Sequence, residues 1–261
     1  MNEIITTFAD ALEKAGLKPD QVCVPSDILF EPEIVKRFGF DYFHTTRGRA
    51  IAFGTGLKLA NPALKVVPFT GDLMTIGGNH FVHGSRRNME LTVICINNFV
   101  YRKIAGKSLS SAAQKFSPYS TFEEPFNIPH LGNSCSAIYT ARWTALHTEE
   151  LTASIAEALG KKGLSVIEIL APGPDYYTGI SKVNIDLVRF YYDNSEIRNN
   201  EDPKNVGIKP DSKIIVGKFT SKERPTFIDQ YNAQLSSVLG EKFTPHGIRS
   251  GADPGGKNGG D

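Results

Sequence analysis

The chain has 261 residues, enough for one large domain or for one domain with an appendage. Its 29 basic residues balance 28 acidic ones, so charge gives no reason to expect a nucleic acid or an anionic membrane as a partner. No apolar run approaches the roughly 20 residues that a membrane-spanning helix needs. The first residues also lack the basic start and apolar core of a signal peptide, so we expect a cytoplasmic protein.

Helical and strand-like patterns follow one another along the chain and predict an α/β fold. The expected helices cover residues 3–15, 49–60, 76–88, 128–135, 147–159 and 226–239. The expected strands cover residues 21–24, 66–69, 91–96, 137–142, 164–170 and 214–219. Thr148 is the expected N-cap of the fifth helix, because its hydroxyl can accept a hydrogen bond from the first turn.

Three stretches lack such patterns. Residues 102–127 are polar and irregular, and a loop of this length is usually functional or disordered. Residues 247–261 are rich in Gly, Pro and Asp, so we expect a disordered or partner-clasping tail. Periodicity weakens after Gly179. We therefore divide the chain into a main domain, residues 1–180, an extension of residues 181–246 that packs on it or on a partner, and the tail.

Residues 66–100 combine a strand, a helix and a second strand, with polar residues where both strands end. Gly71 and Asp72 follow the first strand, and Asn97 and Asn98 follow the second. Strands joined by a crossover helix are parallel, and ligands bind beyond the carboxyl ends of parallel strands. Asp72 and Asn98 should therefore lie side by side. Their carboxylate and amide oxygens suit Mg²⁺ with a diphosphate; otherwise Asp72 is a helix cap and the asparagines form a turn.

These residues, with Ile76-Gly77-Gly78-Asn79-His80, resemble the thiamine diphosphate (TPP) fingerprint in the β subunit of 2-oxoacid:ferredoxin oxidoreductases. His44-Thr45-Thr46 and Gly48-Arg49-Ala50 extend the resemblance, which covers residues 5–180 and, more weakly, 214–231. It implies a TPP-binding fold, a parallel sheet with helices on both faces. It also implies oxidative decarboxylation of a 2-oxoacid, acylation of coenzyme A, and electron transfer to ferredoxin or another acceptor. The implied partners are an α subunit, with γ or δ subunits as further candidates.

The resemblance also assigns residues to roles. It implies that Asp72, Asn98 and the carbonyl oxygen of Val100 bind Mg²⁺. His44 is the implied catalytic residue, in contact with substrate or cofactor; on its own it would be an ordinary turn histidine. The implied TPP contacts are Gly71, Asp72, Ile76, Gly77, Gly78, Asn79, His80, Asn97, Asn98, Val100 and Tyr101.

Three departures surround this site. The loop after Gly71 is two residues shorter than the family's Gly-Asp-Gly-Asp pattern, and Leu73 stands where we expect phosphate oxygens. Residues 102–107 are basic instead of rich in Gly and Thr, and Arg47 replaces a histidine. Two interpretations remain open: a remodelled TPP site, which we take as the working hypothesis, or a non-catalytic paralogue that keeps the fold and scaffolds the complex.

The cysteines indicate a further difference. Relatives usually hold an iron–sulfur cluster, which needs about four converging thiolates. This chain has three separated cysteines, Cys23, Cys95 and Cys135, and Ala171-Pro172-Gly173-Pro174 occupies the place of another ligand. We therefore expect no cluster on this chain. His80 and His83 share a helix face, but packing near the cofactor is a better interpretation than a separate metal site.

Overall fold

The computed structural model describes residues 2–28, 30, 32–71, 73–98, 103–104, 107–108, 125–171, 187–209 and 212–246. In this part of the chain nine strands form one sheet, in the order β10-β11-β8-β9-β5-β4-β1-β2, with β3 beside β1. The strands are β1 (Val22–Ser26), β2 (Asp41–His44), β3 (Lys65–Val66), β4 (Phe69–Thr70), β5 (Thr92–Asn97), β8 (Tyr139–Thr144), β9 (Ser165–Leu170), β10 (Ser195–Ile197) and β11 (Ile214–Ser221). A separate antiparallel pair joins β6 (Lys103–Ile104) to β7 (Lys107–Ser108).

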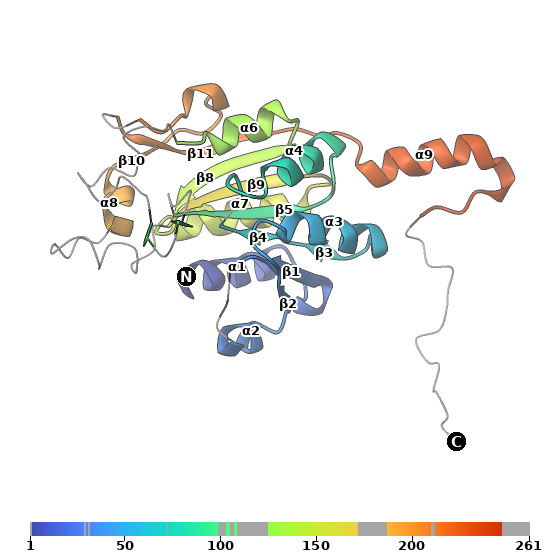
Figure 1. Ribbon diagram of the computed structural model, residues 1–261, viewed down its shortest axis with the longest axis horizontal. Helices are drawn as coiled ribbons and strands as arrows, with labels where there is room; N and C mark the ends of the chain where they lie inside the picture. Colours follow the sequence, from blue (N-terminus) through green and yellow to red (C-terminus); the bar gives the residue numbers. More distant parts are fainter. Residues whose placement is uncertain are drawn as a thin grey trace, which may run out of the picture.

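Helices cover both faces of this sheet (Figure 1). They are α1 (Asn2–Lys14), α2 (Pro32–Phe38), α3 (Ala50–Ala60), α4 (Gly78–Arg87), α6 (Ile128–Ser134), α7 (Thr148–Gly160), α8 (Leu187–Asp193) and α9 (Phe227–Leu239). Short 3₁₀ turns occupy η1 (Pro19–Gln21), η3 (Pro203–Asn205) and η4 (Gly240–Lys242). None of the helices in the described ranges is long and apolar enough to cross a membrane.

Alternate residues of the strands pack into two separate cores, because successive side chains of a strand point to opposite faces. Ile94 and Ile96 of β5 join a cluster with residues of α1 and α7. Val93 and Cys95 of the same strand join a second cluster with residues of α3, α4 and α6. The sheet is therefore buried between two helical layers, as the α/β prediction requires.

The strand directions confirm the predicted parallel sheet. From β2 through β1, β4, β5 and β9 to β8, every neighbouring pair is parallel. At the far edge β11 runs antiparallel to β8, and β10 pairs with β11. A strand of the predicted extension, residues 181–246, thus joins the sheet of the main domain. The domain boundaries stay a prediction, and the tail, residues 247–261, lies outside the described residues.

The element predictions hold for every long periodic segment, with a few differences. The apolar run at residues 66–69 is divided into β3 and β4, since Pro68 has no N–H to donate to a ladder. The N-cap prediction was wrong: His147, not Thr148, is the N-cap of α7. We did not predict the short elements α2, β2, α8 and β10, which carry too few residues for a periodic pattern.

A buried ion pair crosses the middle of the sheet. Arg142 of β8 donates from Nε to Glu168 of β9 at 2.6 Å, and both side chains are fully buried. Asn97, at the end of β5, donates its amide to the other carboxylate oxygen of Glu168 at 2.7 Å. Arg142 also donates to the carbonyl oxygen of Val206 at 2.5 Å, in the segment that leads to β11. The network therefore ties three strands and the β11 segment together.

Glu168→Gln should lower the free energy of unfolding by about 3–5 kcal/mol, because it leaves the buried guanidinium of Arg142 without a counter-charge. Urea unfolding of the purified protein, followed by circular dichroism, measures this change. Glu13→Gln, on the exposed side of α1, is the matched control and should have little effect. A loss of less than about 1 kcal/mol for Glu168→Gln would contradict the role given to this pair.

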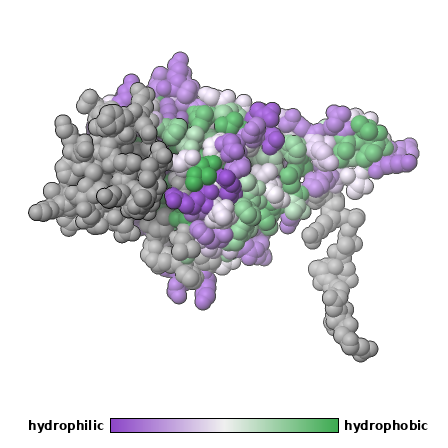
Figure 2. Space-filling model, viewed as in Figure 1, coloured by the Kyte–Doolittle hydropathy of each residue, from purple (hydrophilic) through white to green (hydrophobic). Residues whose placement is uncertain are grey.

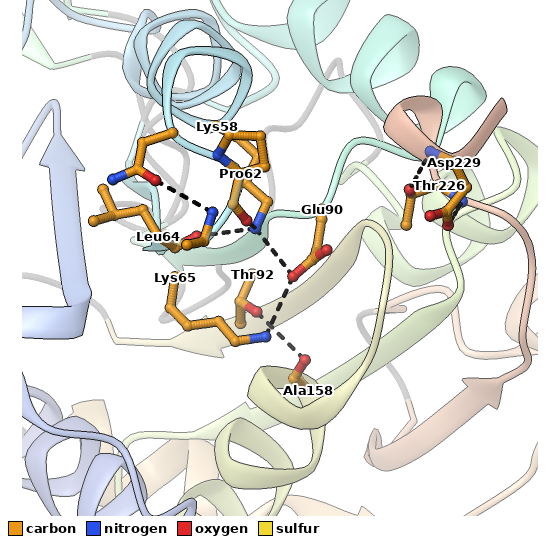
Figure 3. A network of polar contacts seen from close by, with 11 residues as sticks. Lys58, Pro62, Leu64, Lys65, Glu90, Thr92, Ala158, Thr226 and Asp229 are labelled. Carbon is orange, nitrogen blue, oxygen red and sulfur yellow. Dashed lines mark hydrogen bonds and ion pairs between the residues drawn. The ribbon is translucent and has the colours of Figure 1, made fainter. Parts of the chain in front are cut away.

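A network of two lysines and one glutamate lies at the end of α3 (Figure 3). Lys58 is 1% exposed, and its Nζ donates to the carbonyl oxygens of Pro62 at 2.7 Å and Leu64 at 2.9 Å. Glu90 accepts from both Lys58 and Lys65, at 3.1 and 3.3 Å. Burial lowers the pKa of Lys58, which the nearby Glu90 opposes. Both lysines are therefore structural and neutralised by one carboxylate.

The helix α9 stands away from the sheet (Figure 1), and none of its residues is buried. Thr226 and Asp229 form a capping box at its start, and the Asn88 amide donates to the carbonyl oxygens of Arg224 and Pro225. Hydrophobic surface gathers at its far end (Figure 2), where Val238 is 71% exposed. Exposed apolar surface of this kind usually marks a contact with another protein.

Candidate functional site

The ends of four parallel strands meet at one edge of the sheet, which we call the carboxyl edge. The last residue of β1, Ser26, pairs with His44 of β2 and Phe69 of β4, and Thr70 of β4 pairs with Cys95 of β5. The segments that follow β4 and β5 therefore start side by side. This confirms the predicted geometry of the strand ends, whereas Asp72, Val100 and Tyr101 lie outside the described residues.

Asp27 organises this edge, and the sequence interpretation missed it. Its Oδ2 accepts hydrogen bonds from the Gly48 N–H at 2.9 Å and the Thr70 hydroxyl at 2.6 Å. Its Oδ1 accepts from the Gly71 N–H at 2.8 Å. The side chain is largely buried, so these bonds satisfy a carboxylate that would otherwise be costly. The sequence signal was weak, because the predicted strand stops at residue 24, whereas the observed strand β1 runs to Ser26 and places Asp27 directly at its end.

The turn that contains Gly48, which Asp27 holds in place, is in direct contact with the loop before α4. Gly48 has φ +67°, and a Cβ atom there would lie 2.5 Å from the Cβ of Ile76 and 2.9 Å from the nitrogen of Gly77. Only glycine combines that backbone conformation with such a close approach. Ile76 and Gly77 are therefore positioned by direct contact with a turn that Asp27 holds.

The start of α4 fits an anion. Gly77 is its N-cap and supplies no side chain to the first N–H groups, although the Asn79 side chain accepts from the His80 N–H at 2.9 Å. A helix N-terminus offers N–H donors and a partial positive charge, which suit a phosphate group. Because α4 follows β4, this terminus lies at the carboxyl edge. The residues present therefore fit a diphosphate group.

Leu73 does not occupy the place that we expected. It is 1% exposed and packs in the core cluster with Phe81 and Val93, beneath α4. Its side chain therefore anchors the loop in the hydrophobic core. The expectation that it would fill the phosphate position was wrong. The loop after Gly71 has a hydrophobic anchor in Leu73; that it is shorter than in the family pattern stays a prediction.

The two asparagines after β5 differ in environment. Asn97 is 4% exposed, and its amide donates to Glu168 within the sheet. Asn98 is only partly buried and stands at the carboxyl edge, one residue further along. The metal-binding role of Asn98 and the TPP-binding role of Asn97 stay predictions, but the structure gives Asn97 a structural role as well.

The histidines of the site are of two kinds. His44 is exposed at the end of β2, beside the end of β1. The Nε2 atom of His80 is shielded from solvent and has no hydrogen-bond partner in the described ranges. Burial, then the charges of Arg49 and His83, lower the pKa of His80, which keeps its ring neutral near pH 7. No group of three His, Cys, Asp or Glu side chains suited to a metal occurs among the described residues.

The cysteines lie on separate elements. Cys23 is buried on β1, Cys95 is buried on β5, and Cys135 is partly exposed at the end of α6. Burial raises the pKa of each thiol, which disfavours the thiolate form that metals bind. The expectation of no iron–sulfur cluster on this chain stays a prediction.

Known proteins resemble this chain over most of its length. Residues 30–169 match the family described as "Thiamine pyrophosphate enzyme, C-terminal TPP binding domain". The "2-oxoglutarate synthase subunit KorB" of Methanothermobacter marburgensis is 38% identical over 249 residues, which cover 91% of this chain and 86% of that relative. The chain is a β subunit of the 2-oxoacid:ferredoxin oxidoreductase family. This confirms the resemblance found in the sequence.

Two further relatives belong to the same family of β subunits. The KorB subunit of Methanocaldococcus jannaschii is 35% identical and covers 91% of each chain. The "2-oxoacid:ferredoxin oxidoreductase subunit beta" of Saccharolobus solfataricus is 33% identical over 77% of this chain and 66% of that relative. All three are named as subunits of enzymes. The scaffold interpretation gains no support from them.

A solved structure shows the same fold. The 2-oxoglutarate:ferredoxin oxidoreductase from Magnetococcus marinus, with 2-oxoglutarate, coenzyme A and succinyl-CoA bound, superposes with a TM-score of 0.72. It is 24% identical and covers 91% of this chain and 84% of its own. The predicted TPP-binding fold is therefore confirmed, with the parallel sheet and two helical layers described above.

Gly48→Ala should destabilise the protein by about 2 kcal/mol or more, because it combines an unfavourable backbone conformation with a clash against Ile76. Gly56→Ala, on α3, is the matched control: a Cβ atom there meets nothing within 4 Å. In a helix that control should be neutral or stabilising, by up to about 1 kcal/mol. Urea unfolding measures both variants, and equal stability would show that the Gly48 contact is unimportant.

Proposed function

We propose that this β subunit binds TPP together with Mg²⁺ at the carboxyl edge and takes part in the oxidative decarboxylation of a 2-oxoacid. The observation that carries the proposal is the meeting of the β4 and β5 ends beside the start of α4. A helix N-terminus supplies donors for the diphosphate, and the strand ends supply oxygen ligands for the cation.

The proposed metal ligands are Asp72, Asn98 and the carbonyl oxygen of Val100. Asn98 follows directly after β5, and Gly71, the residue before Asp72, is fixed by Asp27. A carboxylate, an amide oxygen and a carbonyl oxygen suit Mg²⁺, which completes its octahedral shell with phosphate oxygens or water. The residues on which these two ligand segments begin, Gly71 and Asn97, are thus held in place by hydrogen bonds.

The proposed TPP contacts lie along the loop before α4 and the end of β5. They are Gly71, Asp72, Ile76, Gly77, Gly78, Asn79, His80, Asn97, Asn98, Val100 and Tyr101. The neutral ring of His80, with its shielded Nε2, is suited to a hydrogen bond with a bound group. His44 is the proposed catalytic residue: an exposed imidazole at this edge can hold or move a proton at the substrate.

TPP, when bound, supplies the electron sink for loss of CO₂ from the 2-oxoacid. The residues of this chain contribute in other ways, because they hold the diphosphate, position the substrate and control proton transfer. Three relatives are named for 2-oxoglutarate or for 2-oxoacids with ferredoxin. We therefore take 2-oxoglutarate as the first substrate to test, with coenzyme A as acyl acceptor and ferredoxin or another carrier as electron acceptor.

The proposal includes an α subunit, and a γ or δ subunit as a further candidate. The relatives are named as subunits, which supports assembly with other chains. The exposed end of α9, with Tyr231, Val238 and Leu239 all more than a third exposed, is suited to such a contact. The specific partners, and the ferredoxin contact, stay part of the proposal.

Asn98→Ala and Asp72→Ala should each lower kcat/KM of the assembled complex by about 10–100-fold or more, the range seen when groups around a bound metal are removed. The assay follows 2-oxoglutarate- and coenzyme A-dependent reduction of an electron acceptor. Asn205→Ala, an exposed residue of η3, is the control and should keep full activity. Full activity in both metal-ligand variants would refute the proposed site.

A further inference from the structure

A groove lies on the side of the sheet opposite to the carboxyl edge. It is bounded by Ile138, which precedes β8, by the end of α7 at Gly160, and by the link between β11 and α9 at Pro225. Its volume is about 760 Å³, within the roughly 300–1,000 Å³ typical of small-molecule sites. None of the proposed TPP contacts that the structure describes borders it.

The groove gathers four basic side chains from two elements: Lys161 and Lys162 after α7, and Lys222 and Arg224 after β11. We call it the basic groove. Three acidic residues also line it, but two of them are engaged: Glu157 pairs with Lys218 at 3.0 Å, and Asp229 accepts from the Thr226 N–H in the α9 cap. Only Glu223 remains to oppose the four cations.

The lysines of the basic groove differ from Lys58 and Lys65 in their ion pairing. Lys58 and Lys65 share the carboxylate of Glu90, as Figure 3 shows. Lys161, Lys162 and Lys222, in contrast, have no ion pair with any residue that the structure describes; the closest oxygen partner of Lys222 is the Asn133 amide at 3.5 Å. Partial burial, then the charge of Arg224, lower the pKa of Lys222, although the residue is exposed.

Arg224 lines the groove, and hydrogen bonds hold its side chain in place. Its guanidinium donates to the carbonyl oxygens of Ser85 and Arg86 at the end of α4, at 3.0 Å each. Both bonds come from Nη2, while Nε is shielded from solvent and has no partner in the described part of the chain. Lysines at the end of α7 would be favourable for the helix dipole alone. Arg224 has its own structural role at the end of α4, but neither explanation accounts for Lys222, which arrives from another element and increases the repulsion.

We propose that the basic groove binds a small molecule that carries phosphate groups, with Lys161, Lys162 and Lys222 contacting the phosphates. Lysine is a common phosphate ligand because its ammonium is a compact charge on a flexible stem. Ile138 and Pro225 provide an apolar wall for the uncharged part of such a ligand. A hollow of this volume, with cations on two sides and an apolar wall, suits a small anion. This site is separate from the proposed TPP site.

The test is a lysine footprint of the purified complex, loaded with one equivalent of TPP and Mg²⁺ per chain, so that the carboxyl edge is filled without free TPP to compete for the basic groove. Lysines are acetylated with and without inorganic pyrophosphate or ADP, and each site is quantified by mass spectrometry. We expect saturable protection of Lys161, Lys162 and Lys222. Lys14 and Lys36, exposed on α1 and α2, are the internal controls and should label equally in all samples.

A variant gives a second, independent measurement. The triple substitution Lys161→Ala, Lys162→Ala, Lys222→Ala should weaken pyrophosphate binding at least roughly tenfold in a titration of complex loaded with one equivalent of TPP per chain, because it removes three charge-assisted contacts. The pair Lys14→Ala, Lys36→Ala should leave binding unchanged. The proposal is overturned if the groove lysines are not protected or do not react in the complex, if controls are protected equally, or if only an acidic peptide protects them.

Discussion

The carboxylate of Asp27 is the interaction on which the carboxyl edge depends. Its two oxygens accept three hydrogen bonds from segments far apart in the sequence: the turn at Gly48, the end of β4 at Thr70, and the loop at Gly71. A buried carboxylate is stable only when it is satisfied in this way, so these segments are coupled. The Gly48 turn in turn fixes Ile76 and Gly77. The loop after Gly71 is therefore held at both ends.

Much of the fold follows from local pattern. The runs around β5, β8 and β9, and the helical spacing of α1, α3 and α7, predict their elements because each buries an apolar face. The adjacency of β4 and β5 follows from the short crossover through α4. By contrast β2, four residues long and not buried, becomes a strand only because it pairs with β1. Such pairing depends on tertiary contacts that no local pattern contains.

The sequence was enough to predict where the site lies in the sheet, but not which side-chain contacts hold it together. The sequence indicates which strand ends meet, because parallel strands end at one edge. It does not show that Leu73 turns into the core, that Asn97 reaches Glu168, or that Asp27 accepts three bonds. Each depends on the direction of a side chain once the sheet is assembled. The same limit applies to the basic groove, whose cations come from residues about 60 positions apart and meet only because β11 pairs with β8.

We propose above that the carboxyl edge anchors TPP with Mg²⁺. The most direct measurement is the amount of TPP and Mg²⁺ bound per copy of this chain in the complex purified with its natural subunits. The account predicts about one TPP and about one Mg²⁺ per chain, as expected of a diphosphate held through a single octahedral cation. No bound TPP, even after addition of excess cofactor with Mg²⁺, would contradict it and would move the search for the active site to the partner subunits.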